Sequence, residues 1–379
     1  MRKIYADSAS TSFPKAPGVS DAIKSYLDTG AYNINRGGYA GSYDIAMEIL
    51  DARQQLADMF HVNSPLQVVF TPGATCSLNM LLGGLLKHGD HVITTSMEHN
   101  AVMRPLHALT KAGVAYDAVV CGIDGSFNAH DIVPFIKKET KLVVMTHASN
   151  VCGTVMPVDA VSEICKKHNI RLVIDTAQTA GVLEMPTAVD AIVFAGHKGL
   201  MGPQGIGGFV IQEQFASEIT PTIVGGTGSR SYDYNQPQTL PDKFESGTIN
   251  IPGIIGIKKA TEYINTVGTK AIYDHEMALT SAFISQVQDI NGIKIIGKKD
   301  TSGRVAVVSL NFPEKDNANI AAILDNDYGI MTRCGLQCAP SAHKTLGTYP
   351  HGTVRFSFGH FNTMGDVEYI VQALKEIMK

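Results

Sequence analysis

The fold is decided by a stretch that reads Arg171-Leu172-Val173-Ile174-Asp175-Thr176-Ala177-Gln178. An apolar run of this kind, followed at once by polar residues, is typical of a strand covered on both faces of a sheet. The same pattern recurs in Gln67-Val68-Val69-Phe70, His91-Val92-Ile93-Thr94, Lys141-Leu142-Val143-Val144-Met145, Ala191-Ile192-Val193-Phe194 and Gly208-Phe209-Val210-Ile211. Helical stretches such as residues 74–86 and 159–168 separate these runs. The alternation predicts an α/β layer sandwich with a mainly parallel sheet.

The rest of the chain predicts a second, smaller unit. A length of 379 residues fits two domains better than one or three. Residues 225–229 and 233–241 are rich in Gly, Pro, Asn and Gln, which indicates long surface loops, and such loops are usually functional. A helical period from about residue 256 to 289 then leads to the run Arg304–Leu310. We expect this run to be the first strand of a small α/β unit.

Composition and charge exclude several classes of partner. The net charge is −4, and no run of Lys or Arg forms the stripe that would neutralise a nucleic-acid backbone. The N-terminal segment carries Asp7 where a secretory signal would need an apolar stretch, and no apolar segment reaches about 18 residues. We therefore expect a cytoplasmic protein with reduced cysteines that binds neither nucleic acid nor membrane.

Polar residues follow each predicted strand, at the edge where open α/β sheets bind ligands. Lys198 comes soon after the run 191–194 and lies between Gly196 and Gly199. Burial there would lower the pKa of the lysine and leave a neutral amine that attacks an aldehyde. Asp175 ends another predicted strand, where a carboxylate could hold a pyridinium nitrogen protonated. The pair predicts a pyridoxal 5'-phosphate (PLP) site in which Lys198 forms the Schiff base.

The turn Gly73-Ala74-Thr75 adds a candidate phosphate site, because it begins a helix whose free N–H groups and positive dipole end suit an anion. Taken singly, each feature has an ordinary structural explanation. A lysine after a strand is usually a solvated loop residue, and an aspartate there is more often a helix cap. His99 alone would more often be an ordinary loop histidine. The ordered combination favours the functional interpretation.

A family resemblance is carried by motifs that occur in a fixed order along the chain. They are Asp7-Ser8-Ala9-Ser10-Thr11, Gly73-Ala74-Thr75, Met97-Glu98-His99-Asn100-Ala101, His147-Ala148-Ser149-Asn150-Val151-Cys152-Gly153, Asp175-Thr176-Ala177-Gln178, Gly196-His197-Lys198, Arg333-Cys334-Gly335-Leu336-Gln337-Cys338-Ala339 and Thr353-Val354-Arg355-Phe356-Ser357. This set resembles the class V aminotransferase family, specifically its cysteine desulfurases and selenocysteine lyases. The resemblance covers nearly the whole chain.

The resemblance implies a fold and a domain division. The fold is type I of the PLP-dependent transferases, with a mainly parallel seven-stranded sheet in a large domain and a smaller α/β domain beside it. We expect the large, PLP-binding domain to comprise residues 17–257. The small domain would comprise residues 1–16 and 258–379 and would carry a catalytic cysteine loop.

The resemblance also implies which residues bind the cofactor. Lys198 is the covalent lysine, His99 stacks on the ring and takes part in catalysis, and Asp175 pairs with the ring nitrogen. The remaining contacts, to the ring oxygen and the phosphate, are implied for Asn150, Gln178, Ala74, Thr75, His197 and, in a homodimer, Thr248 of the partner subunit. Two of these residues, Asn150 and Gln178, could contact the substrate instead.

The implied reaction is removal of sulfur from L-cysteine to give L-alanine. Arg355 matches the arginine that binds the substrate carboxylate, for which a guanidinium is well shaped. Arg333 and Arg36 are further candidates for substrate binding. Cys338 matches the mobile-loop cysteine that takes the sulfur as a persulfide, with a sulfur-acceptor protein as a possible partner. L-selenocysteine is the alternative substrate.

Three departures from the family pattern affect these expectations. Ala195 stands where the family often has a phosphate-binding serine, so another group, for example in the 225–229 loop, must replace it. The loop before Cys338 has Leu336 and Gln337 where histidines are common, and Cys334 adds a second thiol that we expect to tune or protect the loop. The segment 33–38 keeps an Arg-Gly pair but lacks a neighbouring histidine, which bears on substrate preference.

Other functions fit the sequence less well. An aminotransferase or another PLP lyase would use the same lysine and leave Cys338 as a bystander. A nicotinamide-dependent dehydrogenase is disfavoured because residues 202–208 lack the Rossmann spacing. A zinc site from Cys334, Cys338 and His343 lacks the ligand spacing of structural zinc, so no metal is expected. A non-enzymatic sulfur-carrier binding protein is the remaining alternative.

Overall fold

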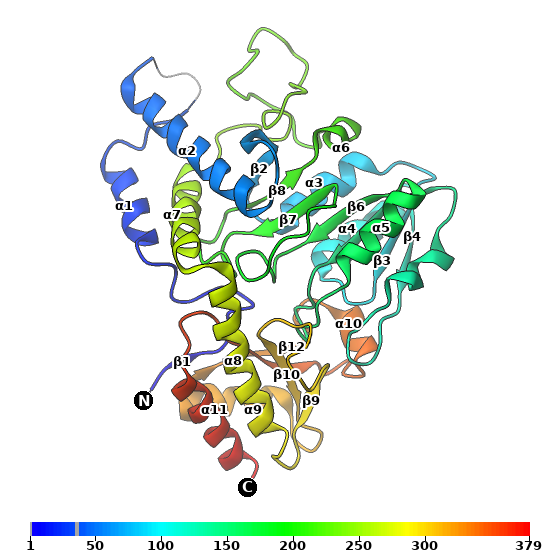
Figure 1. The fold of residues 1–379 in the computed structure, drawn as a ribbon, viewed down its shortest axis with the longest axis vertical. Helices are drawn as coiled ribbons and strands as arrows, with labels where there is room; N and C mark the ends of the chain where they lie inside the picture. The colour runs from blue at the N-terminus through cyan, green and yellow to red at the C-terminus, as the bar shows by residue number, and fades with distance from the viewer. Residues whose placement is uncertain (1, 35–37) are drawn as a thin grey trace.

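A seven-stranded sheet forms the centre of the molecule in the computed structural model, which describes residues 2–34 and 38–379 (Figure 1). Its strands are β2 (Val68–Thr71), β3 (His91–Thr95), β4 (Ala115–Val119), β5 (Thr140–Thr146), β6 (Arg171–Asp175), β7 (Ala191–Ala195) and β8 (Gly207–Ile211). Their order is β2-β8-β7-β6-β5-β3-β4. β8 pairs antiparallel with β2 and β7, and the other pairs are parallel. The predicted α/β fold with a mainly parallel sheet is confirmed.

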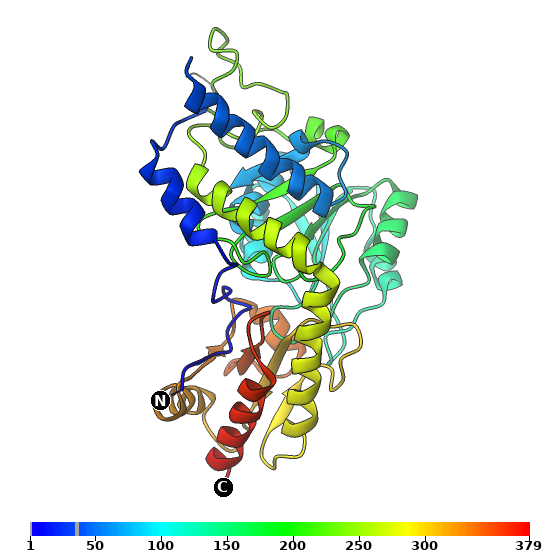
Figure 2. The same cartoon turned by 60° about the vertical axis from the view of Figure 1, so that its left-hand side comes forward.

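Helices cover both faces of this sheet because successive strand residues point to opposite sides. Val143 and Met145 of β5 pack in one apolar core with α1 (Val19–Asp28), α2 (Ala40–Met59), α5 (Val158–His168) and α7 (Ile251–Val267). Leu142 and Val144 of the same strand pack in a second core with α3 (Ala74–Leu85), α4 (Asn100–Thr110) and α6 (Glu213–Glu218). Figure 2 shows the blue helices α1 and α2 beside the yellow-green α7. Burial on both faces explains why the strands read as continuous apolar runs.

A second sheet lies at the end of the molecule that carries both termini (Figure 1). Its antiparallel strands, in the order β12-β13-β10-β9, are β9 (Lys294–Ile296), β10 (Val307–Asn311), β12 (Arg333–Gly335) and β13 (Thr353–Ser357). A third apolar core joins this sheet to α8 (Thr269–Val287), α9 (Asn317–Tyr328) and α11 (Met364–Ile377). The N-terminal β1 (Ile4–Tyr5) pairs in parallel with β11 (Ile330–Met331), and α10 (Pro340–Thr345) follows β12 in the chain. The first residues therefore join the C-terminal unit.

Some elements differ from the sequence expectations. Strand β4 was not predicted, because Tyr116 and Asp117 interrupt its apolar pattern and an edge strand tolerates half-exposed residues. The helical period from about residue 256 to 289 is two helices, because Gly268, with φ of 90°, ends α7 and precedes α8. The strand predicted from Arg304 begins at Val307. The domain boundary expected after residue 257 falls inside α7, and the domain division stays a prediction.

Candidate active site

The carboxyl ends of the central strands meet at one edge of the seven-stranded sheet. Strands β3, β5, β6 and β7 run parallel, and β2 has the same direction because β2 and β7 are both antiparallel to β8. A cavity of about 550 Å³ lies at this edge. Its lining includes the predicted residues Ala74, Thr75, His99, Asn150, Asp175, Gln178, His197 and Lys198. The structure therefore brings these side chains together.

Lys198 lies on a tight turn directly after β7. A Cβ on Gly196 would lie 2.8 Å from the carbonyl oxygen of Ile206, so the turn requires glycine at this position. Burial lowers the pKa of Lys198 to about 8, while Asp175 raises it and nearby arginines lower it. The turn therefore presents an amine that loses its proton more easily than an ordinary lysine, as attack on an aldehyde requires.

Asp175 ends β6 with its side chain buried beside the same cavity. Its Oδ1 accepts the N–H of Ala177 at 2.9 Å. Burial raises the pKa of Asp175, and the Ala177 hydrogen bond and the Lys198 charge lower it. The carboxyl thus stands where a protonated heterocyclic nitrogen could pair with it.

A second buried carboxyl, Glu98, lies next to this strand and was missed by the sequence analysis. It accepts the hydroxyl of Thr95 at 2.6 Å and the N–H of Thr146 at 2.9 Å, and Thr146 is the register partner of Asp175. Burial raises the pKa of Glu98 to about 8. Charged residues are rarely buried, so the position next to His99 was the only signal in the sequence.

His99 caps α4 and faces the cavity as a neutral ring. Its Nδ1 accepts the N–H of Ala101 at 3.0 Å. Burial, together with the positive charges of Lys198 and Arg355, lowers the pKa of His99 to about 4. Because Nδ1 is an acceptor in a neutral imidazole, the proton is on Nε2.

The start of α3 and the turn after β7 form the end of the cavity that suits an anion. Gly73 precedes the helix, and a Cβ on Gly207 would lie 2.8 Å from the Cα of Gly73, so β8 needs glycine to pass this turn. Nδ1 of His197 is buried and has no hydrogen-bond partner in the part of the chain that the structure describes. Burial lowers the pKa of His197 to about 4. Helix N–H groups and an unpaired imidazole nitrogen are suitable ligands for a phosphate.

Arg355 is almost completely buried on β13 and contacts Asn150, which lines the cavity. Its NH2 group donates to Asp7 Oδ1 at 2.8 Å and to Ser10 Oγ at 2.7 Å, and NH1 donates to the carbonyl oxygen of Asn150 at 3.0 Å. Its Nε has no partner among the described residues. Arg333, its register partner, is exposed and lies within 3.5 Å of Ser10 Oγ. Both arginines thus face the N-terminal motif.

Cys338 and Cys334 face different parts of the molecule. Cys338 is exposed in the loop between β12 and α10. Its backbone carbonyl oxygen accepts the N–H of Asn100, the residue after His99, at 2.7 Å. Cys334 belongs to β12 and packs against the apolar core of the small sheet. Because side chains alternate along a strand, Cys334 points away from the face that carries Arg333.

Two predicted elements do not line the cavity of their own chain. Thr248 is exposed outside it, and the 225–229 loop lies beside Gln236 and residue 247 instead. Ala195 lines the cavity and offers no polar side-chain atom. Arg36 lies outside the described residues.

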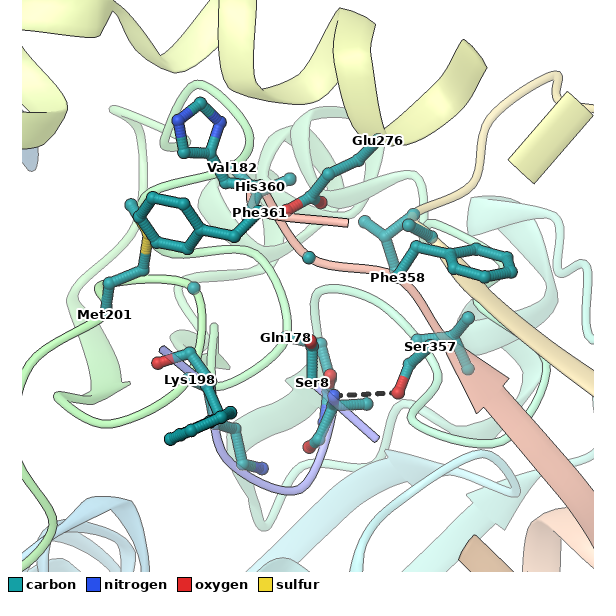
Figure 3. Close-up of a pocket in the computed structure, with 18 of the residues that line it drawn as sticks. Ser8, Gln178, Val182, Lys198, Met201, Glu276, Ser357, Phe358, His360 and Phe361 are labelled. Carbon is teal, nitrogen blue, oxygen red and sulfur yellow. Dashed lines mark hydrogen bonds between the residues drawn. The ribbon is translucent and has the colours of Figure 1, made fainter. Parts of the chain in front are cut away.

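A second, smaller cavity of about 50 Å³ shares the wall formed by Gln178 and Lys198 (Figure 3). It is lined further by Ser8, His360 and Glu276, whose carboxyl group points into it. Burial raises the pKa of Glu276 to about 8. This buried carboxyl was also not predicted.

Two expected absences can be compared with the described part of the chain. Over residues 2–34 and 38–379, no helix is long and apolar enough to cross a membrane. Within the same ranges, no cluster of three or more His, Cys, Asp or Glu side chains is placed to hold a metal ion.

Comparison with known proteins identifies similar chains over the whole length. The family model for aminotransferase class-V matches residues 4–370. A probable cysteine desulfurase from Methanothermobacter thermautotrophicus is 31% identical over 381 residues, which covers 99% of this chain and 94% of that relative. A cysteine desulfurase from Shigella flexneri is 28% identical and covers 98% of this chain and 93% of its own. The apo structure of a cysteine desulfurase from Thermococcus onnurineus superposes with a TM-score of 0.93 at 31% identity, covering 99% of this chain and 94% of that one.

Proposed function

Because the chain belongs to the aminotransferase class-V family, we propose that it is a PLP-dependent cysteine desulfurase that converts L-cysteine to L-alanine and a persulfide on Cys338. The observation that carries this proposal is that the loop of Cys338 is hydrogen-bonded to Asn150, which lines the cavity that also contains Lys198 and Asp175. A reactive amine, a buried carboxyl and a thiol on an adjoining loop are the groups that this reaction needs.

The side chains at the cavity suit PLP. Lys198 would bind its aldehyde covalently, Asp175 would keep the ring nitrogen protonated, and the neutral His99 would stack on the ring. The phosphate would lie at the start of α3, near Thr75 and Nδ1 of His197, which has no partner among the described residues. Further contacts are proposed for Ala74, Asn150 and Gln178. When bound, PLP withdraws electrons from the substrate α-carbon and makes the groups attached to it labile.

The residues on β12 and β13 would orient the substrate. Arg355 has an unpaired Nε–H in the described structure, which leaves a donor for the substrate carboxylate while Asp7 and Ser10 hold its NH2 group. The exposed Arg333 would add a second positive charge at the same end. Arg36 stays a prediction. Lys198, as a neutral amine, would take the α-proton of the substrate and return it to the carbon skeleton.

Cys338 would then remove the sulfur. Its thiolate attacks the substrate sulfur, so an S–S bond forms as the Cβ–S bond breaks. The electron pair of the broken bond stays with the carbon skeleton, which takes up a proton and leaves as L-alanine. The two sulfur atoms are each oxidised by one electron and Cβ is reduced by two, so no external oxidant is required. The persulfide remains on the enzyme for transfer to an acceptor.

A homodimer would complete the phosphate site with Thr248 of the partner subunit. In its own chain Thr248 is exposed and lies outside the cavity. Several large apolar side chains near the same end of the molecule are exposed, among them Tyr43 and Met47 of α2 and Val224 and Tyr232 of the loop that follows α6. Figures 1 and 2 both show this loop projecting beyond α2. Burial of these side chains against a second copy would account for their exposure. Cytoplasmic location likewise stays a prediction.

Parallel incubations of the purified protein with L-cysteine and L-selenocysteine test the proposal. The proposal predicts L-alanine from cysteine, with sulfide released when a reductant is present, and no product from a Lys198→Ala variant. Alanine from selenocysteine alone would identify a selenocysteine lyase instead. A keto acid in place of alanine would indicate an aminotransferase, and a protein without PLP absorbance would contradict both.

A further inference from the structure

The loop that carries Cys338 is short and firmly attached to the rest of the structure. Only residues 336–339 separate β12 from α10. The carbonyl oxygen of Gln337 accepts the side-chain N–H of Asn150 at 2.7 Å, and that of Cys338 accepts the backbone N–H of Asn100 at 2.7 Å. Asn150 lines the cofactor cavity, and Asn100 follows His99 in the chain. Both peptide units around the thiol are therefore anchored on active-site turns.

The backbone of this loop is strained. Gln337 has φ of 42° and Cys338 has φ of 58°, so two successive residues other than glycine adopt the left-handed conformation. That conformation costs free energy for residues with a Cβ and persists only when the surroundings impose it. The result is that Gln337 turns into the protein, 5% exposed, while Cys338 is exposed.

The buried side chain of Gln337 provides the third anchor. Its Nε2 donates to the carbonyl oxygen of Thr353 at 3.1 Å and reaches that of Arg333 at 3.4 Å. Its Oε1 lies 2.7 Å from Nε2 of the fully buried His343, whose Nδ1 lies 2.7 Å from the Thr348 hydroxyl.

The donor and the acceptor of each hydrogen bond in the series Thr348–His343–Gln337 can be assigned. Burial lowers the pKa of His343 to about 4, so its ring carries one proton at neutral pH. Since the amide nitrogen of Gln337 already donates to carbonyl oxygens, its Oε1 must accept the His343 proton. Thr348 therefore donates to His343, His343 donates to Gln337, and Gln337 donates to the two strands of the small sheet. Both polar side-chain atoms of Gln337 have partners, as a rigid network requires.

We propose, on the basis of the function proposed above, that Gln337 is the positioning residue for Cys338: its amide, held by His343 and Thr353, imposes the left-handed turn that directs the thiol toward the cavity. The residue before the proposed nucleophile thus serves as an internal anchor. It does not reach the reacting atoms. Its loss would misplace the thiol and leave proton transfer by Lys198 intact.

The volume-conserving substitution Gln337→Met removes the hydrogen bonds and keeps the core filled. We expect the rate of sulfur transfer from L-cysteine to fall by about 10- to 100-fold, the loss that follows when a reacting group is displaced by about 1 Å. The exchange of the α-proton of L-alanine in deuterated buffer, followed by NMR, should stay within about twofold of the native rate, because it needs Lys198 and not Cys338. A purely structural defect would slow both reactions.

Two further variants test whether the loss is specific to the hydrogen bonds of Gln337. Gln67→Ala removes another buried glutamine that donates to a backbone carbonyl, that of Ile211 at 3.1 Å, in the large sheet, and it should leave sulfur transfer unchanged. Thr348→Val removes the hydrogen bond between Thr348 and His343. It should lower the rate of sulfur transfer, by less than Gln337→Met does, and leave α-proton exchange unchanged.

The possible results separate the two proposals. Native sulfur transfer in Gln337→Met, or a parallel loss of sulfur transfer and α-proton exchange, would overturn the positioning role. If the Cys338→Ala variant releases sulfur from cysteine at the native rate, the proposed desulfurase mechanism is wrong, whatever the result for Gln337→Met.

Discussion

The shifted pKa of Lys198 leads to a quantitative prediction about capture of the cofactor. At a pKa of about 8, about one tenth of the Lys198 side chains are neutral at pH 7, whereas an ordinary lysine with a pKa of about 10.4 would be neutral in only about one molecule in 2500. Burial thus increases the reactive fraction by about 200-fold at pH 7. The rate at which cofactor-free protein binds PLP covalently should rise with pH and level off above about pH 8.

The assay is stopped-flow absorbance of cofactor-free protein mixed with PLP across the pH range, followed by borohydride reduction and mass spectrometry to locate the adduct. The Lys198→Ala variant gives the background from other lysines. Because the Asp175 carboxylate raises the pKa of Lys198, the Asp175→Asn variant should show a midpoint at lower pH. A native midpoint near 10, or an upward shift in Asp175→Asn, would refute the reasoning.

Three further predictions follow from residues around the site. In the folded protein the pKa of Glu276 is about 8, above its ordinary value of 4.5. Between these two pH values the folded state retains a proton that the unfolded chain releases. The free energy of unfolding should therefore fall as pH rises through this window, by at most about 1.4 kcal/mol per pH unit. Urea unfolding should show a smaller fall in Glu276→Gln, and an equal fall would contradict the assignment. Gly207→Ala places a Cβ 2.6 Å from the carbonyl oxygen of Phe194 and 2.8 Å from the Cα of Gly73. It should therefore lower the free energy of unfolding by about 1–3 kcal/mol. It should also weaken PLP binding, which cofactor titration measures. Because Cys334 faces the small core, Cys334→Ser should form the persulfide within about twofold of the native rate, and a complete loss would show that the second thiol takes part.

The central sheet and most of the cavity lining could be predicted because both depend on local sequence. Apolar runs mark the buried strands, and parallel strands place the residues that follow them at one edge, so Asp175 and Lys198 could be associated without a structure. Strand β4 could not, because a half-exposed edge strand such as the one with Tyr116 and Asp117 carries no continuous apolar run. The break at Gly268 was hidden in a pattern that stays helical on both sides.

The contacts that shape the chemistry were less accessible from the sequence because they join distant residues. The ion pair of Arg355 with Asp7 connects the two ends of the chain. Gln337 was recognised only as a departure from a family pattern, and its link to His343 requires a three-dimensional arrangement. The buried carboxyl of Glu98 contradicts the usual preference of charged residues for solvent, so only its position next to His99 indicates it.

The most direct test of the proposed function is to locate the sulfur on the protein after a single turnover. The PLP-loaded enzyme is mixed with one equivalent of L-cysteine without reductant, alkylated and digested, and the cysteine peptides are analysed by mass spectrometry beside an assay for L-alanine. We predict one extra sulfur atom on the peptide that contains Cys338, in amounts equal to the alanine formed, and neither product in Lys198→Ala. Alanine without a persulfide on Cys338, or a persulfide confined to another cysteine, would contradict the mechanism.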